Sequence, residues 1–152
     1  IEVELTESIL LEQSQSILDT LNALRTMGIR ISLDDFGTGY SSLTYLRRFP
    51  VDKIKIERAF ITNIHNERDS EAIVSAIIAM AHKLGLETVA EGVEYRETVS
   101  ILKEMSCNYL QGYLFSKPVT SDEIIERYAP TALLTPLAQK ELGNSGRASL
   151  TL

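Results

Sequence analysis

The sequence predicts an α/β fold in which parallel strands alternate with helices. Five short β-rich stretches are separated by segments with helical periodicity, and this alternation implies parallel strands joined by right-handed crossovers. A motif with acidic or amide side chains follows each stretch, as expected where residues gather at the carboxyl ends of parallel strands. The predicted strands are residues 1–5, 29–33, 51–56, 87–90 and 109–111.

Two helices between these strands are predicted from apolar spacing and from residues typical of helix ends. An amphipathic helix around Leu21 closes at Gly28. A second helix begins with Ser70 as its N-cap and ends at Gly85. Its predicted apolar stripe consists of Ile73, Val74, Ile77, Ile78, Ala81 and Leu84.

Three further segments have helical patterns. A short helical turn over residues 42–48 ends before Pro50, and a longer helix covers residues 93–105. Thr120 and Glu123 have the spacing of a capping box, which begins another helix. The tail, residues 130–152, is predicted to start as a helix and then to become flexible.

The composition favours one globular domain and argues against some partners. Hydrophobic residues make up 44% of the 152 residues, which is ample for a core. The net charge is −6 and no run of Lys and Arg occurs, so polymeric nucleic acid is not an expected partner. No apolar run approaches the roughly 20 residues of a membrane span, and no signal-peptide pattern opens the chain.

The cysteine and histidine residues indicate the cellular compartment and are not expected to take part in the site. Cys107 is the only cysteine, so no internal disulfide can form, and a reducing, cytoplasmic compartment is expected. Because free cysteines are often buried, Cys107 is interpreted as part of the core. His65 and His82 lie outside every motif and are interpreted as solvated surface residues. Because the chain begins at Ile1 inside a predicted strand, we expect a longer protein whose upstream segments could anchor it to a membrane.

Carboxylates and one amide stand at the ends of the predicted strands. Convergent carboxylates repel one another, so such a cluster survives folding mainly when cations compensate it. Mg²⁺ and Mn²⁺ prefer oxygen ligands, whereas Zn²⁺ more often binds His or Cys. The candidate residues are Glu4, Asp34, Asp35, Glu91 and Gln111. An acidic rim with a purely structural role is the alternative interpretation.

Lys55 is predicted to point toward this acidic region. In the stretch KIKIE, Ile54 and Ile56 alternate with Lys55, which therefore faces away from the two isoleucines. A lysine that points toward the inside or the rim of a barrel needs an anionic neighbour, and a carboxylate or a phosphate supplies one. The alternative is a plain surface lysine on an edge strand.

Four motifs in this order resemble the EAL-domain family of cyclic di-GMP phosphodiesterases. They are DDFGTGYSS at 34–42, KIKIE at 53–57, AEGVE at 90–94 and QGYLFSKP at 111–118. The resemblance covers residues 1–128 and implies a TIM-like (β/α)8 barrel, which typically takes about 250 residues. Residues 1–129 would form the C-terminal part of that domain, a partial barrel of about five parallel strands whose N-terminal strands are missing. Residues 130–152 would be a tail beyond it.

The resemblance also implies metal ligands and a catalytic lysine. Glu4, Asp34, Asp35 and Glu91 would hold a two-metal site of Mg²⁺ or Mn²⁺. Lys55 would orient or deprotonate the nucleophilic water with help from Asp34. The reaction implied is hydrolysis of cyclic di-GMP to linear pGpG.

Three more residues receive roles from the resemblance alone. Gln111 would support the same water, and Glu94 would be a further active-site carboxylate. Glu7 would anchor the loop of residues 36–42, which in the family arranges metal binding and dimer contacts.

Two departures from the family pattern keep a second function open. The EAL tripeptide and an Asn-bearing strand, each with a metal ligand, are absent, and Glu57 stands where relatives commonly carry Asp. An open piece of five strands leaves two edges unpaired, so a homodimer or a complementing N-terminal barrel segment is an expected partner. The alternative to an enzyme is a degenerate or truncated EAL domain that acts as a cyclic di-GMP receptor or a dimerisation module.

Overall fold

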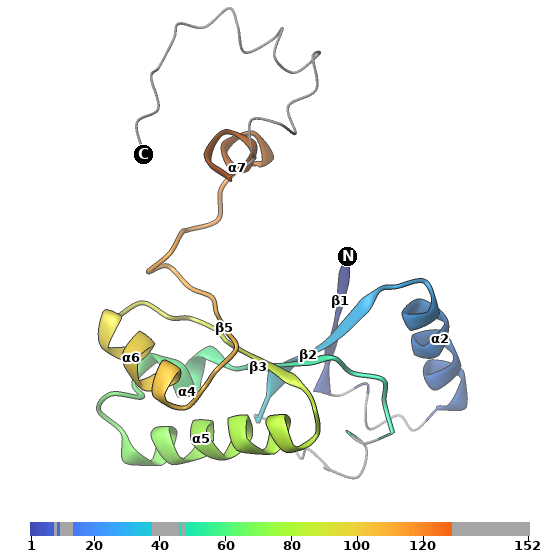
Figure 1. Cartoon of the computed structure of the whole chain (residues 1–152), viewed down its shortest axis with the longest axis horizontal. Helices are drawn as coiled ribbons and strands as arrows, with labels where there is room; N and C mark the ends of the chain where they lie inside the picture. The colour runs from blue at the N-terminus through green and yellow to red at the C-terminus, as the bar shows by residue number, and fades with distance from the viewer. Residues whose placement is uncertain (8, 10–13, 38–45, 47, 129–152) are drawn as a thin grey trace, which may run out of the picture. The chain divides into compact units, whose positions relative to one another are not determined.

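The computed structural model of the chain describes residues 1–7, 9, 14–37, 46 and 48–128 (Figure 1). Contacts divide the chain into two compact units, Ile1–Lys117 and Pro118–Leu152. The first unit contains a sheet and its flanking helices. The second is described for residues 118–128, which contain helix α7 (Ser121–Tyr128).

Five parallel strands form one sheet in the order β1-β2-β3-β4-β5, which confirms the predicted α/β class. Their bounds are β1 Glu2–Thr6, β2 Arg30–Phe36, β3 Lys53–Ile56, β4 Glu87–Ala90 and β5 Tyr109–Leu110. Each strand lies beside its neighbour in sequence, as in a segment of a barrel. The carboxyl ends of all five strands therefore lie along one edge of the sheet.

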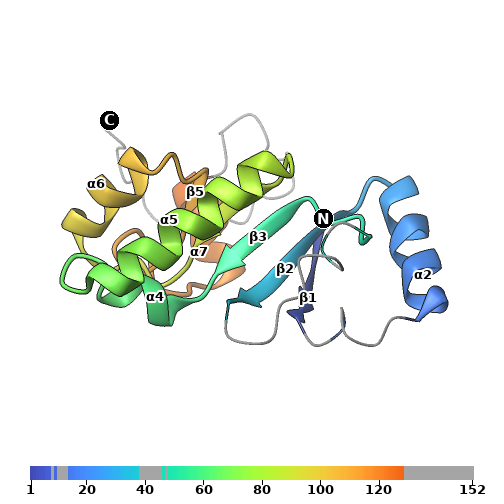
Figure 2. The same cartoon turned by 90° about the horizontal axis from the view of Figure 1, so that it is seen from below.

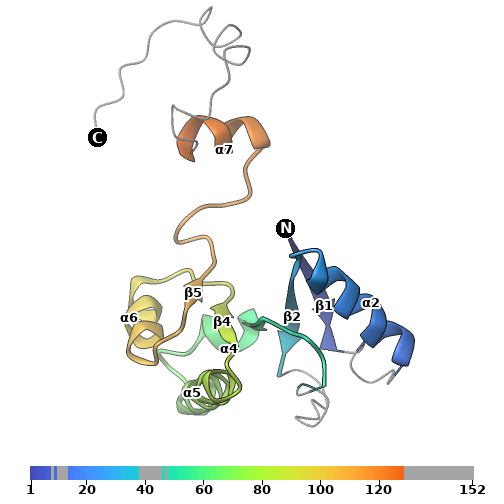
Figure 3. The same cartoon turned by 45° about the vertical axis from the view of Figure 1, so that its right-hand side comes forward.

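Four helices described in the first unit flank this sheet. Helix α2 packs against β2, and helix α5 packs against β3 and β4. Figure 2 shows α5 running alongside β3, and Figure 3 shows α2 beside β1 and β2. The bounds are α2 Gln15–Thr26, α4 Arg58–Thr62, α5 Arg68–Lys83 and α6 Arg96–Glu104.

The two faces of the sheet differ in chemistry. One face packs against the helices and buries apolar side chains such as Leu33, Ile54 and Ile56, all with no exposed surface. Full burial of such a side chain contributes about 1.5–3 kcal/mol to stability. Because successive side chains on a strand alternate in direction, Glu4 and Lys55 point to the other face. That second face carries the polar groups from which a site can be built.

The start of α5 differs from the prediction that Ser70 is its N-cap. The helix begins at Arg68 with Glu67 as the N-cap residue, and Ser70 lies buried in the first turn. The Ser70 hydroxyl donates a hydrogen bond to Glu67 Oε2 at 2.9 Å. The hydroxyl is thus satisfied by a side chain three residues earlier, and that contact replaces the predicted cap.

The apolar stripe of α5 is narrower than predicted. The buried residues are Val74, Ile77, Ile78 and Ala81. Ile73 and Leu84, which the sequence also placed in the stripe, are 41% and 39% exposed. Both lie at the margin of the helical face that the sheet covers, so spacing alone overestimated its width.

Other predicted helix boundaries are confirmed or displaced. Thr120 and Glu123 form the capping box of α7, because Thr120 N–H donates to Glu123 Oε2 at 3.0 Å and Glu123 N–H donates to Thr120 Oγ1 at 3.4 Å. Helix α6 begins at Arg96, three residues after the prediction, since the backbone of Val93 is paired with Gln111 instead. The predicted turn over 42–48, apart from Leu46 and Arg48, and the tail over 130–152 lie outside the described residues.

The remaining expectations concern single side chains and the membrane. His65 and His82 are exposed, as predicted. Cys107 is half-buried, and its Sγ donates to Tyr109 O at 3.3 Å. None of the described helices has both the length and the apolar character needed to cross a membrane.

Candidate functional site

Lys55 lies at the centre of three carboxylates. Its side chain is only 8% exposed, and its ammonium nitrogen lies 2.8 Å from Glu4 Oε1 and 2.8 Å from Glu91 Oε1. Asp34 Oδ1 is the third neighbour, at 3.0 Å. We call these four residues the Lys55 cluster.

The register of the strands explains why these side chains meet. Glu4, Asp34 and Lys55 occupy β1, β2 and β3 at positions that point away from the helices. Glu91 directly follows β4, and its N–H donates to Ile56 O at 3.2 Å, which extends the pairing of β3 with β4. Four consecutive strands therefore each supply one charged group to the same end of the sheet.

The cluster has more negative than positive charge. Burial acts to lower the pKa of the Lys55 ammonium, but hydrogen bonds to Glu4, Glu91 and Asp34 together outweigh burial and raise that pKa well above its usual range. Lys55 is therefore charged at neutral pH. One ammonium faces three carboxylates, so the cluster favours the approach of a further cation.

A bulge at the end of β2 directly follows Asp34 and turns Phe36 to the face that the helices cover. Leu33 lies opposite Ile54 and Phe36 lies opposite Ile56, so β2 contains one more residue than β3 over this span. Asp35 sits in the bulge with φ 55, a left-handed conformation that Asp tolerates better than most residues. Bulges of this kind re-aim side chains beside functional sites.

A second polar layer lies on the same face, nearer the amino ends of the strands. Lys53 Nζ lies 2.6 Å from Glu2 Oε2 and 4.9 Å from the centre of the Tyr109 ring. Tyr109 donates its hydroxyl hydrogen to Glu87 Oε1 at 3.0 Å, and Glu87 also pairs with Arg30 at 3.2 Å. The hydrogen bond to Lys53 lowers the pKa of Glu2. This layer of charged side chains borders the Lys55 cluster on the side of the amino ends of the strands.

The sequence as a whole matches a known family. Residues 1–118 match the EAL domain. The chain belongs to the EAL-domain family. NbdA, a cyclic di-GMP phosphodiesterase of Pseudomonas aeruginosa, is 50% identical over 120 residues, which are 78% of this chain and 15% of NbdA. YkoW, a signaling protein of Bacillus subtilis, is 46% identical over 123 residues, which are 81% of this chain and 15% of YkoW.

Solved EAL structures share the described fold. The PaMucR phosphodiesterase in complex with c-di-GMP matches with a TM-score of 0.76 and 44% identity, over 81% of this chain and 50% of that chain. BlrP1 of Klebsiella pneumoniae, in a manganese and cy-diGMP complex, matches with a TM-score of 0.70 and 38% identity, over 77% of this chain and 30% of that chain. A calcium complex of BlrP1 matches equally well. This EAL chain thus spans half or less of these solved chains and about 15% of the two curated relatives.

The structure gathers some of the predicted site residues and separates others. Glu4, Asp34, Lys55 and Glu91 form the Lys55 cluster. Glu94 lies outside it and pairs with Arg58, whose Nη2 is 2.7 Å from Glu94 Oε1. This pair was not expected from the sequence, although the EGVE motif drew attention to Glu94.

The positions of three further candidates leave their roles as predictions. Gln111 follows β5 at the same end of the sheet, and its N–H donates to Ala90 O at 2.9 Å. Asp35 is exposed beside Asp34. Glu7 is buried at 7% exposure, while residues 38–42 of the loop that it would anchor lie outside the described residues.

The donor set of the Lys55 cluster suits the divalent cation that the family implies. The three carboxylate oxygens meet within 3.0 Å of one atom, and Mg²⁺ and Mn²⁺ prefer such oxygens. Among the described residues, no group of three His, Cys, Asp or Glu stands ready to hold a metal ion. The oxygens are spaced around an ammonium, whereas Mg²⁺ needs ligands at about 2.0–2.1 Å. Glu4, Asp34 and Glu91 would therefore have to close in to hold the cation.

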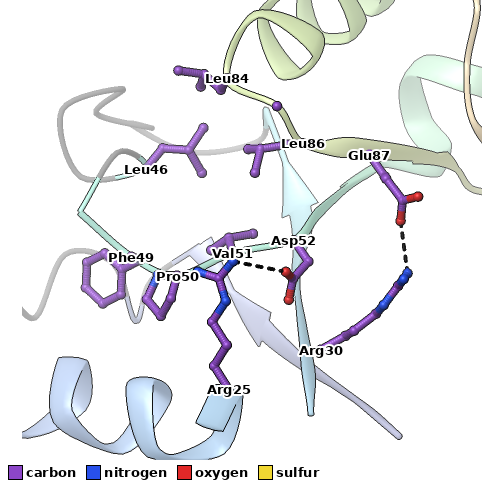
Figure 4. A pocket seen from close by; sticks show the side chains of 11 residues that line it. Arg25, Arg30, Leu46, Phe49, Pro50, Val51, Asp52, Leu84, Leu86 and Glu87 are labelled. Carbon is purple, nitrogen blue, oxygen red and sulfur yellow. Dashed lines mark hydrogen bonds and ion pairs between the residues drawn. The ribbon is translucent and has the colours of Figure 1, made fainter. Parts of the chain in front are cut away.

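A pocket of about 510 Å³ lies at the opposite end of the strands (Figure 4). Arg30 and Glu87 begin β2 and β4 at this end, and Asp52 precedes β3. Figure 4 shows Arg30 pointing toward Glu87 and Arg25 toward Asp52. The pocket contains none of the candidate site residues.

Proposed function

We propose that the protein containing this chain hydrolyses cyclic di-GMP to linear pGpG with Mg²⁺ or Mn²⁺. The observation that carries the proposal is the Lys55 ammonium held among three carboxylates at the carboxyl ends of four strands. The phosphodiesterase names of NbdA and PaMucR support the substrate class. The metal complexes of BlrP1 support a divalent cation.

The proposed reaction is an in-line displacement at phosphorus. A water oxygen forms a bond to one phosphorus, the bond from that phosphorus to the 3′ oxygen breaks, and the leaving oxygen receives a proton. When bound, two divalent ions would supply Lewis-acid stabilisation of the attacking and leaving oxygens. The protein's own task is placement and electrostatics.

The residues of the cluster divide this task. Lys55 donates hydrogen bonds and would orient the attacking water. Asp34, whose Oδ1 lies 3.0 Å from Lys55 Nζ, would accept a proton from that water. Glu4, Asp34, Asp35 and Glu91 would hold the metal ions. Gln111 would support the water, and Glu94 would contribute through its ion pair with Arg58.

The alternative function is a receptor or a dimerisation module. One observation favours it: β1 and β5 are the edges of the sheet within the described residues. A homodimer or a complementing N-terminal barrel segment would pair those edges. A receptor of this kind would bind cyclic di-GMP without consuming it.

Product analysis of the full-length protein tests the proposal. The purified protein is incubated with cyclic di-GMP and Mn²⁺ at several pH values between about 7 and 9, and linear pGpG is separated by chromatography. We expect pGpG from the wild type and at least about 10²-fold less from Lys55→Met. Tight binding of cyclic di-GMP with no product at any of these pH values would favour the receptor.

A further inference from the structure

We propose that Arg58 is a positioning residue, which fixes the turn of residues 91–94 and thereby aims Glu91 at Lys55. The inference rests on the proposed function for its effect on turnover. Arg58 is the first residue of α4, directly beyond the β3 strand that carries Lys55. The sequence motifs assign it no role.

Two contacts join Arg58 to the turn. Its Nη2 lies 2.7 Å from Glu94 Oε1, at the end of the turn. Its aliphatic stem covers Gly92, since a Cβ added at Gly92 would lie 2.2 Å from Arg58 Cγ. Gly92 also has φ 70, which few residues other than glycine adopt easily. The guanidinium and the stem of Arg58 thus hold different parts of the same turn.

The other side of the turn is held by the segment after β5. Val93 N–H donates to Gln111 O at 3.0 Å, and Leu114 N–H donates to Val93 O at 3.0 Å. Gly112 approaches so closely that an added Cβ would lie 2.2 Å from Val93 O. The turn is therefore enclosed between Arg58 and residues 111–114.

Glu91 connects this turn to the site. It immediately precedes Gly92, and its Oε1 lies 2.8 Å from Lys55 Nζ. A change in the path of the turn would shift the Glu91 carboxylate relative to Lys55 and to any bound metal. A displacement of a catalytic group by about 1 Å can lower the rate about 10²-fold, so a turn that keeps Glu91 in place would support turnover.

An ordinary surface ion pair is the competing explanation. The Arg58 side chain is 61% exposed, and exposed ion pairs contribute little to stability. In that case loss of the guanidinium would leave metal affinity and turnover unchanged. The close packing of the stem over Gly92 and the enclosure of the turn favour the positioning role.

The experiment uses the full-length protein, with variants that remove the charge of Arg58 or of Glu94 and keep the approximate shape of the side chain. Arg58→Met retains most of the stem, Glu94→Gln retains the shape of its partner, and the double variant tests their coupling. Arg68→Met, at an exposed arginine that begins the next helix, is the matched control. Each protein is assayed for kcat and KM with cyclic di-GMP, and for Mn²⁺ affinity by calorimetry without substrate.

We expect Arg58→Met to lower kcat by about tenfold or more and to weaken Mn²⁺ binding, while Arg68→Met resembles the wild type. The double variant should be no worse than Arg58→Met, and Arg58→Lys should recover part of the loss. Mn²⁺ affinity within twofold of the wild type, additive losses in the double variant, or an equal loss in Arg68→Met would overturn the proposal. If the wild type shows no turnover, the proposed function fails, and Mn²⁺ affinity alone decides the role of Arg58.

Discussion

Asp34 and Phe36 are two residues apart on β2, yet they point to opposite faces of the sheet. Asp34 Oδ1 lies 3.0 Å from Lys55 Nζ, whereas Phe36 is 4% exposed within the core beside the helices. In a regular strand, residues two apart share a face. The extra residue in the bulge reverses this relation, so that one short segment supplies both a site carboxylate and a core aromatic.

The first prediction concerns Asp35, which occupies the bulge with φ 55. Asp35→Val should destabilise the fold by about 1–2 kcal/mol, because a β-branched side chain is strained in the left-handed region. Asp35→Asn should be nearly neutral for stability, since Asn tolerates this conformation. Thermal unfolding of both variants in metal-free buffer gives the comparison, and equal midpoints would contradict the inferred strain.

The second prediction concerns Lys55 as the internal cation of its cluster. Lys55→Met should lower the thermal midpoint in metal-free buffer, because the carboxylates of Glu4, Asp34 and Glu91 would then repel one another without compensation. The loss should be moderate, about 1–3 kcal/mol, since Glu4 is 52% exposed and water screens part of the repulsion.

Metal addition makes this prediction specific. Mn²⁺ should raise the midpoint of Lys55→Met by more than it raises that of the wild type, because the cation replaces the missing charge. Lys83→Met, at an exposed lysine in the last turn of α5, serves as the control and should behave like the wild type. An equal Mn²⁺ response in all three proteins would show that these carboxylates do not bind the ion.

The sequence predicted the strands and the meeting of charges at their ends for a simple physical reason. In a parallel sheet the carboxyl ends must share one edge, so Glu4, Asp34 and Glu91 were expected near one another. The alternation of Lys55 with two isoleucines indicated its direction. The catalytic and metal-binding roles of these residues remain predictions.

The details that sequence reasoning missed depend on contacts between distant segments. Arg58 meets Glu94 only because β3 and β4 pair in one register, which no local pattern contains. The bulge at Asp35 likewise depends on the pairing of β2 with β3. Ser70 resembled an N-cap, but Glu67 begins the helix earlier and accepts its hydroxyl hydrogen.

The third prediction is slow alkylation of Cys107. Burial raises the pKa of its thiol above the ordinary value of 9.0, so the folded protein contains less thiolate than the unfolded chain at the same pH. Burial of the neutral thiol contributes fully to the free energy of unfolding below about pH 9. This contribution is lost as the pH rises further, because the thiol of the unfolded chain ionises first. Iodoacetamide labelling at pH 8, followed by peptide mass spectrometry, should be slower for native than for urea-unfolded protein. Equal rates would refute the effect of burial.

The last prediction separates two glycines that enclose the turn of residues 91–94. A Cβ at Gly92 would collide with the stem of Arg58, which can move, whereas a Cβ at Gly112 would collide with backbone atoms of Val93. Gly112→Ala should therefore lower the thermal midpoint of the protein more than Gly92→Ala does.

The two losses should also respond differently to a shorter side chain at Arg58. Adding Arg58→Ala should recover part of the loss in Gly92→Ala, because it removes the colliding Cγ and Cδ. The close contact with the Cβ of residue 58, at 2.9 Å, and the strain of φ 70 would remain. The same change should recover nothing in Gly112→Ala, whose collision is with the backbone. Thermal midpoints of the single and double variants supply both comparisons. Equal recovery in the two backgrounds would mean that Arg58 does not pack on Gly92 in solution.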